Sequence, residues 1–174
     1  GLITTEENVL LAALYADCVP LYFLDPAHRI VALAHAGWKG TVQRIAFQVI
    51  QLMNERLGSK VSEIRVAIGP SIGRCCYEVD DRVMDHVKKL MPEKSFHDHS
   101  GQGHYMLDLK QINRKIMLEA GILSDHIEVS KWCTHCHPEY FFSHRRDGMP
   151  SGRMASWIGI KARRDASKEG GLSV

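Results

Sequence analysis

Apolar positions early in the chain predict a buried hairpin. Residues 19–24 and 29–34 are almost continuously apolar, and Asp25 and Pro26 between them are typical turn residues. Runs of this length that are apolar on both faces favour strands in the middle of a sheet. Because the connection is short, the two strands are predicted to pair antiparallel. Residues 8–14 form another hydrophobic run, which predicts a further strand buried on both faces.

Residues 40–57 carry the clearest helical pattern. Their apolar side chains recur at steps of three and four residues, which places them on one face of a helix. These side chains are Val42, Ile45, Val49, Met53 and Leu57, and Gly58 follows as a stop. Two further helices are predicted, at residues 80–90 before Pro92 and at residues 108–120, with Asp108 as N-cap and Gly121 as stop.

Shorter patterns complete the chain. Brief apolar runs predict strands at residues 64–68, 126–130, 139–143 and 154–160. Residues 92–104 are polar and rich in His and Gly, which predicts an exposed loop. Since strands and helices alternate while the first hairpin is antiparallel, we expect an α/β fold of the α+β type: a mixed sheet with an antiparallel hairpin, flanked by helices.

The length and composition are typical of one globular domain. The chain has 174 residues, of which 45% are hydrophobic and 24% charged. We expect one domain at residues 1–160 and a frayed tail at residues 161–174, which are charged and rich in Gly and Ser. The 22 basic residues nearly balance the 20 acidic ones, so bulk charge predicts no nucleic-acid partner. No apolar run approaches the ~20 residues of a membrane span.

Cys18 and His35 flank the predicted hairpin. If the hairpin closes on Pro26 and Ala27, Cys18 lies directly opposite His35. Cβ atoms of residues paired in this way are roughly 4.5–5.5 Å apart. A thiolate and an imidazole at that separation can share one metal ion, above all zinc. The alternative is a buried cysteine beside a core histidine.

Several charged residues near these two are candidates for chemistry. Asp17 is either a carboxylate that bonds nearby backbone or a group that moves protons beside the metal. Lys39, in the segment Gly37–Gly40 that is predicted to open the helix, is a candidate phosphate ligand or a solvated side chain.

Two arginines are candidates for binding an anion, because a guanidinium group matches the geometry of phosphate. They are Arg145, predicted to share a strand face with Ser143, and Arg153. The alternative for this region is a surface ion pair between Arg146 and Asp147.

The run Cys133-Thr134-His135-Cys136-His137 matches several kinds of site. It has the spacing of covalent haem attachment and of half a zinc ribbon, but it is also compatible with an ordinary turn that carries cysteines. No second pair at suitable spacing is clear, so the turn is favoured. The adjacent Cys75 and Cys76 make a poor disulfide framework, which predicts a reducing, cytoplasmic location.

Taken in order, these motifs resemble the laccase-domain family, also called multicopper polyphenol oxidoreductases. The resemblance covers about residues 1–160 and rests on seven segments. They are Ala16-Asp17-Cys18-Val19-Pro20, His35-Ala36-Gly37-Trp38-Lys39-Gly40, residues 69–79, Leu107-Asp108-Leu109, Cys133-Thr134-His135-Cys136, Phe141-Phe142-Ser143-His144-Arg145-Arg146-Asp147 and Gly152-Arg153-Met154-Ala155-Ser156.

The resemblance implies a mixed-sheet α/β fold and a catalytic zinc. Family members hold that zinc with the Cys of Ala-Asp-Cys, the His of His-Ala-Gly-Trp and a further upstream His. The first two correspond to Cys18 and His35. No upstream motif of the Gln-Val-His-Gly type is present, so the chain is expected to lack roughly the first third or more of the family domain.

The activity implied by the resemblance is that of a zinc-dependent purine nucleoside phosphorylase with adenosine deaminase activity. Implied substrates are phosphate with adenosine, inosine, guanosine or methylthioadenosine. We expect Cys18, His35 and Asp17 to be catalytic and Lys39, Arg145 and Arg153 to bind substrate. The alternatives are a zinc amidase that edits a cell-wall precursor, as the name of the peptidoglycan editing factor branch suggests, a copper-dependent polyphenol oxidase, and a non-catalytic binding domain. The sequence leaves the oligomeric state open.

Overall fold

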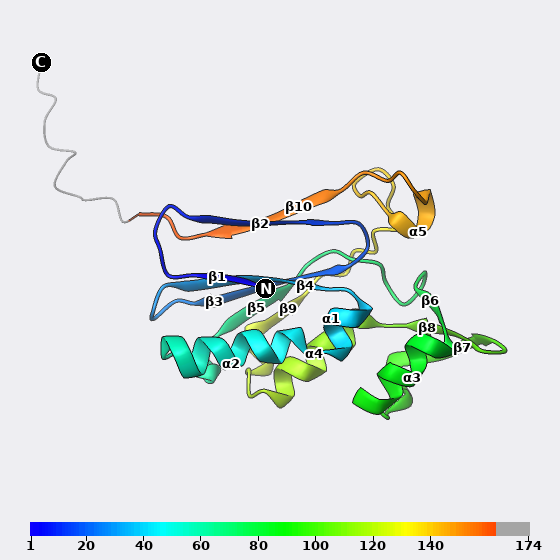
Figure 1. The fold of residues 1–174 in the computed structure, drawn as a ribbon, viewed down its shortest axis with the longest axis horizontal. Coiled ribbons are helices and arrows are strands. Elements are labelled where there is room, and N and C mark those ends of the chain that lie inside the picture. The colour runs from blue at the N-terminus through cyan, green and yellow to red at the C-terminus, as the bar shows by residue number, and fades with distance from the viewer. Residues whose placement is uncertain (163–174) are drawn as a thin grey trace, which may run out of the picture.

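The computed structural model describes residues 1–162 of the chain, and these residues form three layers (Figure 1). A five-stranded sheet lies in the middle, a two-stranded ribbon covers one face, and α2 (Ile45–Leu57) and α4 (Leu109–Glu119) cover the other. Apart from its first two residues, the predicted tail lies outside the described residues. In the described part of the chain, no helix is long and apolar enough to cross a membrane.

The central sheet is mixed, as predicted. Its order is β1-β4-β3-β5-β9, in which β5 and β9 run parallel and the other neighbours antiparallel. The strands are β1 (Leu2–Thr4), β3 (Val19–Asp25), β4 (Ile30–Ala36), β5 (Arg65–Ile68) and β9 (Ile127–Val129). β3 and β4 are buried along most of their length, which explains why both are apolar on both faces.

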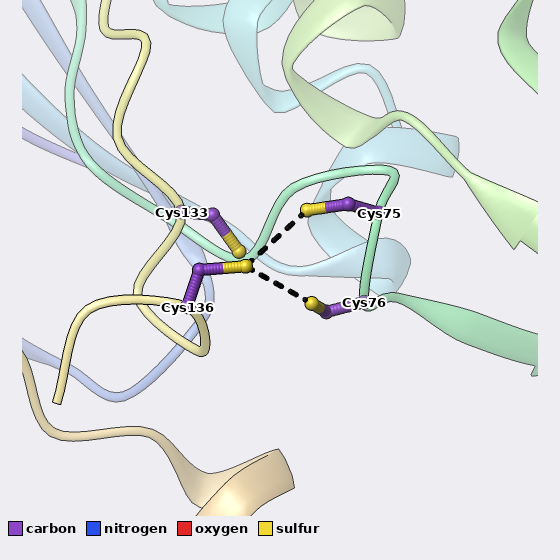
Figure 2. Close-up of side chains that lie close together, drawn as sticks. All are labelled: Cys75, Cys76, Cys133 and Cys136. Carbon is purple, nitrogen blue, oxygen red and sulfur yellow. Dashed lines mark hydrogen bonds between the residues drawn. The ribbon is translucent and has the colours of Figure 1, made fainter.

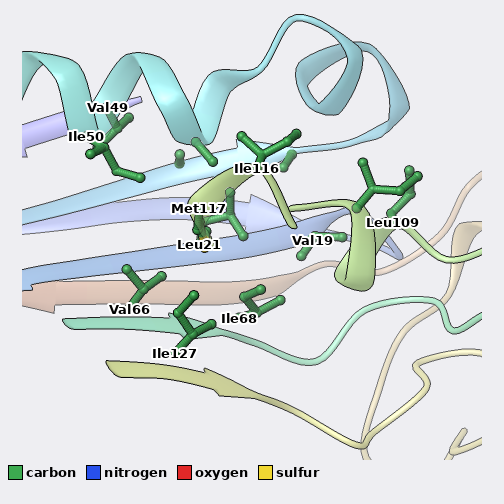
Figure 3. Close-up of a cluster of buried hydrophobic side chains, with 14 of the residues drawn as sticks. Val19, Leu21, Val49, Ile50, Val66, Ile68, Leu109, Ile116, Met117 and Ile127 are labelled. Atoms are coloured by element: carbon green, nitrogen blue, oxygen red, sulfur yellow. The ribbon is translucent and has the colours of Figure 1, made fainter. Parts of the chain in front are cut away.

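The main hydrophobic core lies between this sheet and the helices (Figure 3). Ile50 and Met53 of α2 and Ile116 of α4 are almost fully buried against Leu21 of β3 and Ile68 of β5. α2 ends at Gly58, whose φ of 76° is the left-handed conformation that glycine adopts without strain. The stop predicted at this position is therefore confirmed.

The ribbon consists of β2 (Leu10–Tyr15) paired antiparallel with β10 (Met154–Gly159). The prediction that residues 8–14 are buried on both faces is wrong. Leu11 and Tyr15 face the sheet, whereas Leu10 and Leu14 are 64% and 62% exposed. The physical reason is that an outer ribbon has only one face against the core. The strand is apolar on both faces, but only one of them is covered.

The hairpin of β3 and β4 has a different register from the one predicted. Val19 pairs with Ala36 and Asp25 with Ile30, so His35 lies opposite Pro20 rather than Cys18. The loop contains four residues because the Asp25 carboxylate accepts hydrogen bonds from the backbone of Ala27 (2.9 Å) and His28 (3.1 Å). Four-residue loops built around such a turn are common in hairpins, and they move the pairing by two positions relative to a two-residue loop.

The predicted helix at residues 40–57 is broken into two. α1 (Trp38–Val42) is separated from α2 by Arg44, which has a left-handed φ of 57°. The other two helices are confirmed as α3 (Asp81–Leu90) and α4. The side chain of Asp80 caps α3 and that of Asp108 caps α4, each by accepting a backbone N–H of the first turn.

Two segments differ from their predictions. Residues 92–104 are not a loop, because they enter a small antiparallel sheet of β6 (Glu78–Asp80), β7 (His97–Gly101) and β8 (His104–Leu107). Residues 139–143 are not a strand but lead into the short helix α5 (His144–Asp147). In the first segment β7 pairs with the strand that directly follows it, β8, and in the second Ser143 bonds the distant carboxylate of Asp17. Single-turn 3₁₀ helices occupy Val61–Glu63, Lys94–Phe96 and Ser124–His126.

The first prediction concerns Asp25, whose side chain is fully buried in the hairpin and accepts a 2.8 Å hydrogen bond from His28 Nδ1. Burial alone would raise the pKa of Asp25, but hydrogen bonds from His28 and Ala27 lower it below its ordinary value. We expect Asp25→Asn to reduce the free energy of unfolding at pH 7 by on the order of 1.5–3 kcal/mol. Urea titrations followed by circular dichroism measure this loss.

The pH dependence has a definite sign. Because the folded state depresses the pKa of Asp25, its stabilisation is complete above the unfolded pKa of about 3.9 and is lost as pH falls through the folded pKa. The difference between wild type and Asp25→Asn should therefore shrink below about pH 4. Asp125→Asn, at an exposed position, is the control and should be nearly neutral. A difference that stays constant with pH would contradict the role given to the carboxylate.

Candidate active site

A cavity of about 330 Å³ opens where the ends of several elements meet. It brings together four of the residues that the sequence singled out: Asp17, Cys18, His35 and Lys39. The remaining walls come from α1, from the segment after β5 and from the start of α4. These residues are Gly37, Trp38, Gly40, Ile72, Tyr77 and Leu109.

Cys18 lies just before β3 and packs against Gly37, just after β4. A Cβ atom built on Gly37 would lie only 2.8 Å from the Cys18 sulfur. Gly37 therefore makes room for the thiol at the cavity wall, which explains a glycine at this position of the His-Ala-Gly-Trp segment. Burial, followed by the charge of Asp17, raises the pKa of the Cys18 thiol.

His35 lies near the end of β4 and is exposed on its cavity side. Its ring stacks on the ring of Tyr15 from the ribbon, with 4.6 Å between centroids and 25° between planes. Partial burial lowers the pKa of His35, which favours the neutral imidazole. Neutral imidazole is the form that binds metals, and the stacking limits how the ring can turn.

Asp17 is a buried carboxylate that joins segments distant in sequence. It accepts hydrogen bonds from Thr134 Oγ1 (2.6 Å), Ser143 Oγ (3.0 Å) and the backbone N–H of Arg145 (2.7 Å). Its own carbonyl accepts the N–H of Ile72 at 2.9 Å. With a φ of 82°, Asp17 adopts a backbone conformation that is uncommon outside glycine. These contacts hold the residue next to Cys18 in one position.

Arg145 lies in α5, so the predicted strand alternation with Ser143 is wrong. Ser143 is instead the N-cap of α5 and accepts the N–H of Arg146. The Arg145 guanidinium donates to the carbonyl of Glu78 (2.8 Å) and lies 5.2 Å from the ring centroid of Tyr77. Because Tyr77 lines the cavity, Arg145 is placed beside its wall. Burial raises the pKa of Tyr77 to about 12.

The other two arginines have different surroundings. Arg146 pairs with Asp147 through two N···O contacts of 2.8 and 3.0 Å and also donates to three backbone carbonyls. The alternative of an Arg146–Asp147 ion pair is thus confirmed. Arg153 donates to the carbonyls of Ser151 and Gly152 and is not among the residues that line the cavity.

Lys39 lies on the short α1 rather than at the start of a long helix. Its side chain is exposed, and its Nζ lies 5.7 Å from the ring centroid of Trp38. The ammonium group is therefore close to an aromatic wall of the cavity. This position lets it meet an anion at the cavity mouth.

Sequence reasoning missed one cluster of side chains. The sulfur atoms of Cys75, Cys76, Cys133 and Cys136 all lie within 4.8 Å of one another, so these residues could hold a metal ion. The expectation that Cys133 and Cys136 have no second pair is therefore wrong. Adjacent cysteines such as Cys75 and Cys76 do not show the usual two-residue spacing of a metal-binding pair, and nothing local connects them to residue 133.

The chain matches known proteins over nearly all of its length. The multi-copper polyphenol oxidoreductase laccase family matches residues 1–161. Purine nucleoside phosphorylase YlmD of Bacillus subtilis is 48% identical over 162 residues, which cover 92% of this chain and 58% of that protein. Adenosine deaminase RL5, from an unknown prokaryotic organism, is 39% identical over 91% of this chain and 61% of its own length.

A solved structure agrees with the fold. The crystal structure of YlmD from Geobacillus stearothermophilus is 48% identical and superposes with a TM-score of 0.88, over 92% of this chain and 60% of that one. This chain belongs to the multi-copper polyphenol oxidoreductase laccase family, and it spans between 58% and 61% of the length of these relatives.

The second prediction tests the role of Asp17 in holding the site together. Asp17→Asn tolerates the same left-handed backbone but cannot accept all three hydrogen bonds, so we expect it to lose on the order of 2–3 kcal/mol of unfolding free energy. Thr134→Val removes one donor and should cost about 1–2 kcal/mol. Asp85→Asn, exposed on α3, is the control. Chemical denaturation measures all three, and an Asp17→Asn protein as stable as wild type would refute this role.

Proposed function

We propose that the protein carrying this chain is a zinc-dependent purine nucleoside phosphorylase that also deaminates adenosine. Its substrates would be phosphate with adenosine, inosine, guanosine or methylthioadenosine. The observation that carries the proposal is the single cavity on which Cys18, His35 and Lys39 converge. The names of the relatives support it, since one is a purine nucleoside phosphorylase and another an adenosine deaminase.

Cys18 and His35 fit a zinc ion by their chemistry. One offers a thiol beside a glycine that leaves space for it, and the other a neutral imidazole held by stacking. Thiolate and imidazole are both common zinc ligands. The chemistry that zinc supplies when bound is Lewis-acid activation of water. Within residues 1–162, no third Cys, His, Asp or Glu forms a close group with these two.

Other residues in the cavity, beside it or further along the chain would bind the substrates. Lys39 and Arg145 are cationic and would hold phosphate beside the ribose, with Arg153 as a further anion ligand. Trp38 and Tyr77 present aromatic rings on which a purine can stack. Because its pKa is about 12, Tyr77 keeps its proton at neutral pH and can donate a hydrogen bond to the nucleoside.

The third prediction tests the metal ligands. In the full-length protein, Cys18→Ser and His35→Ala should each lower the zinc content and abolish phosphate-dependent release of hypoxanthine from inosine, because each removes one zinc ligand. Mass spectrometry of metals and chromatography of the reaction products measure the two effects. His99→Ala, at an exposed position of β7 away from the cavity, is the control.

Unchanged zinc and activity in both cavity variants would rule out this metal site. Release of an amino acid from a cell-wall precursor, or copper-dependent oxidation of a phenol, without nucleoside turnover would favour the corresponding alternative enzyme. No turnover in any of these assays would favour a binding domain.

The fourth prediction separates phosphate binding from other roles of the arginines. Arg145→Ala should lower the affinity for phosphate in phosphorolysis roughly 10- to 150-fold, since loss of a charged hydrogen bond costs on the order of 1.5–3 kcal/mol. Deamination uses water, so the same change should leave it largely intact. Arg153→Ala is the matched comparison, and a smaller effect is expected because its guanidinium already bonds two carbonyls of its own loop. Equal losses of both activities in Arg145→Ala would mean that Arg145 supports the fold or the ribose instead.

A further inference from the structure

Four cysteines form a compact group beside the candidate active site (Figure 2). The sulfur of Cys136 lies 3.7 Å from that of Cys75 and 3.3 Å from that of Cys76. Cys133 completes the group, in which every sulfur lies within 4.8 Å of the others. Cys133 is buried and Cys76 half-buried, whereas Cys75 and Cys136 reach solvent.

The parallel pairing of β5 with β9 brings the two cysteine pairs together. Parallel neighbours end at the same edge of a sheet, so the segments that follow them leave side by side. The pairing continues past the strands, because Ser71 forms a bridge with Cys133 and its carbonyl accepts the N–H of Thr134 at 3.1 Å. Each segment then makes a tight turn that carries one cysteine pair.

We propose that Cys75, Cys76, Cys133 and Cys136 bind one structural metal ion in a tetrahedral site, and that this ion is zinc. A zinc–sulfur bond of about 2.3 Å places the four sulfurs of an ideal tetrahedron about 3.8 Å apart. The separations of 3.3 and 3.7 Å are close to that value. They are far longer than the roughly 2.05 Å of a disulfide bond.

One backbone N–H is directed at the cysteine group. The backbone N–H of Gly73 donates to the Cys133 sulfur at 3.2 Å. Gly73 is also close-packed here, since a Cβ on it would lie 3.3 Å from the Cys75 sulfur.

A buried cation lies in the same region. Lys110 of α4 is 8% exposed, and its ammonium donates to the carbonyls of Ser130 (2.9 Å) and Trp132 (3.1 Å), next to Cys133. Burial lowers the pKa of Lys110, while the charge of Asp108 and, less strongly, those of Cys133 and Cys75 act to raise it. Four thiolates around a divalent ion carry two net negative charges, so this ammonium compensates part of that charge.

The chemistry of the ligand set points to zinc. Four thiolates in a tetrahedron are typical of zinc or of iron–sulfur centres. An iron–sulfur cluster places several atoms between its cysteines, whereas these sulfurs are close enough for a single ion. The Cys133–Cys136 segment provides two of the four ligands of a zinc site. The adjacent cysteines Cys75 and Cys76 provide the other two.

The proposed ion would stabilise the walls of the cavity. One cysteine pair lies between Ile72 and Tyr77, which both line the cavity. The other flanks Thr134, which donates to the carboxylate of Asp17. A metal bound by both turns would therefore fix the positions of these walls. This ion would be distinct from one bound by Cys18 and His35.

Metal content of the full-length reduced protein tests the proposal. Wild type, the double variant Cys76→Ser/Cys136→Ser and the control Cys18→Ser are purified alike, and zinc per chain is measured by mass spectrometry. The double variant should lose one equivalent of zinc. On replacement of zinc by cobalt, it should also lose the intense visible absorption of a four-thiolate cobalt site, which Cys18→Ser should keep. Added zinc should raise the unfolding temperature of the metal-free Cys18→Ser variant but not that of Cys18→Ser combined with Cys76→Ser/Cys136→Ser, because both of these proteins lack the Cys18 ligand of the other zinc site.

The outcomes are distinct. Full zinc content and an unchanged cobalt spectrum in the double variant would overturn the proposal, as would a wild-type protein that binds no zinc there under reducing conditions. If the double variant does not fold, the single change Cys75→Ser removes one exposed ligand and should release zinc at a lower chelator concentration than wild type. Equal chelator sensitivity would overturn it too. Nucleoside turnover is not a readout, so the proposed enzymatic function can fail while this site stands.

Discussion

The buried carboxylate of Asp17 is the interaction on which the candidate site depends. It gathers donors from Thr134, Ser143 and Arg145, all more than a hundred positions further along the chain. A carboxylate removed from water must be satisfied by such donors, because an unpaired buried charge is costly. Its hydrogen bonds therefore determine both the position of Cys18 and the path of the segment that carries Arg145.

The parallel strands β5 and β9 supply the second constraint. Their shared edge sends two cysteine-bearing turns along the same side of the cavity. Hydrogen bonds accepted by Asp17 and the proposed metal at the four cysteines would thus act on the same segments. Because Tyr77 lies in the loop after β5, two such contacts limit the motion of Tyr77 and its neighbours.

Local patterns predicted most of the elements of the fold. The apolar hairpin strands, the stop at Gly58 and the cap at Asp108 were within reach of sequence reasoning, since each depends on a few neighbouring residues. The pairing of Cys18 with His35 was placed in the wrong register, because the loop length depended on how the Asp25 side chain is hydrogen-bonded. Even so, both residues reach the same cavity.

The sequence by itself determined the mixed α/β class, the family and the residue types that meet at the cavity, because these follow from hydrophobic periodicity and from short ordered motifs. Only the tertiary structure decided which distant residues meet. It brings Cys75 and Cys76 close to Cys133 and Cys136. It also places Arg145 beside Tyr77 and lets Asp17 accept hydrogen bonds from distant loops. These contacts arise from the parallel pairing of β5 and β9 and from the satisfaction of a buried charge, and neither leaves a periodic signal in the chain.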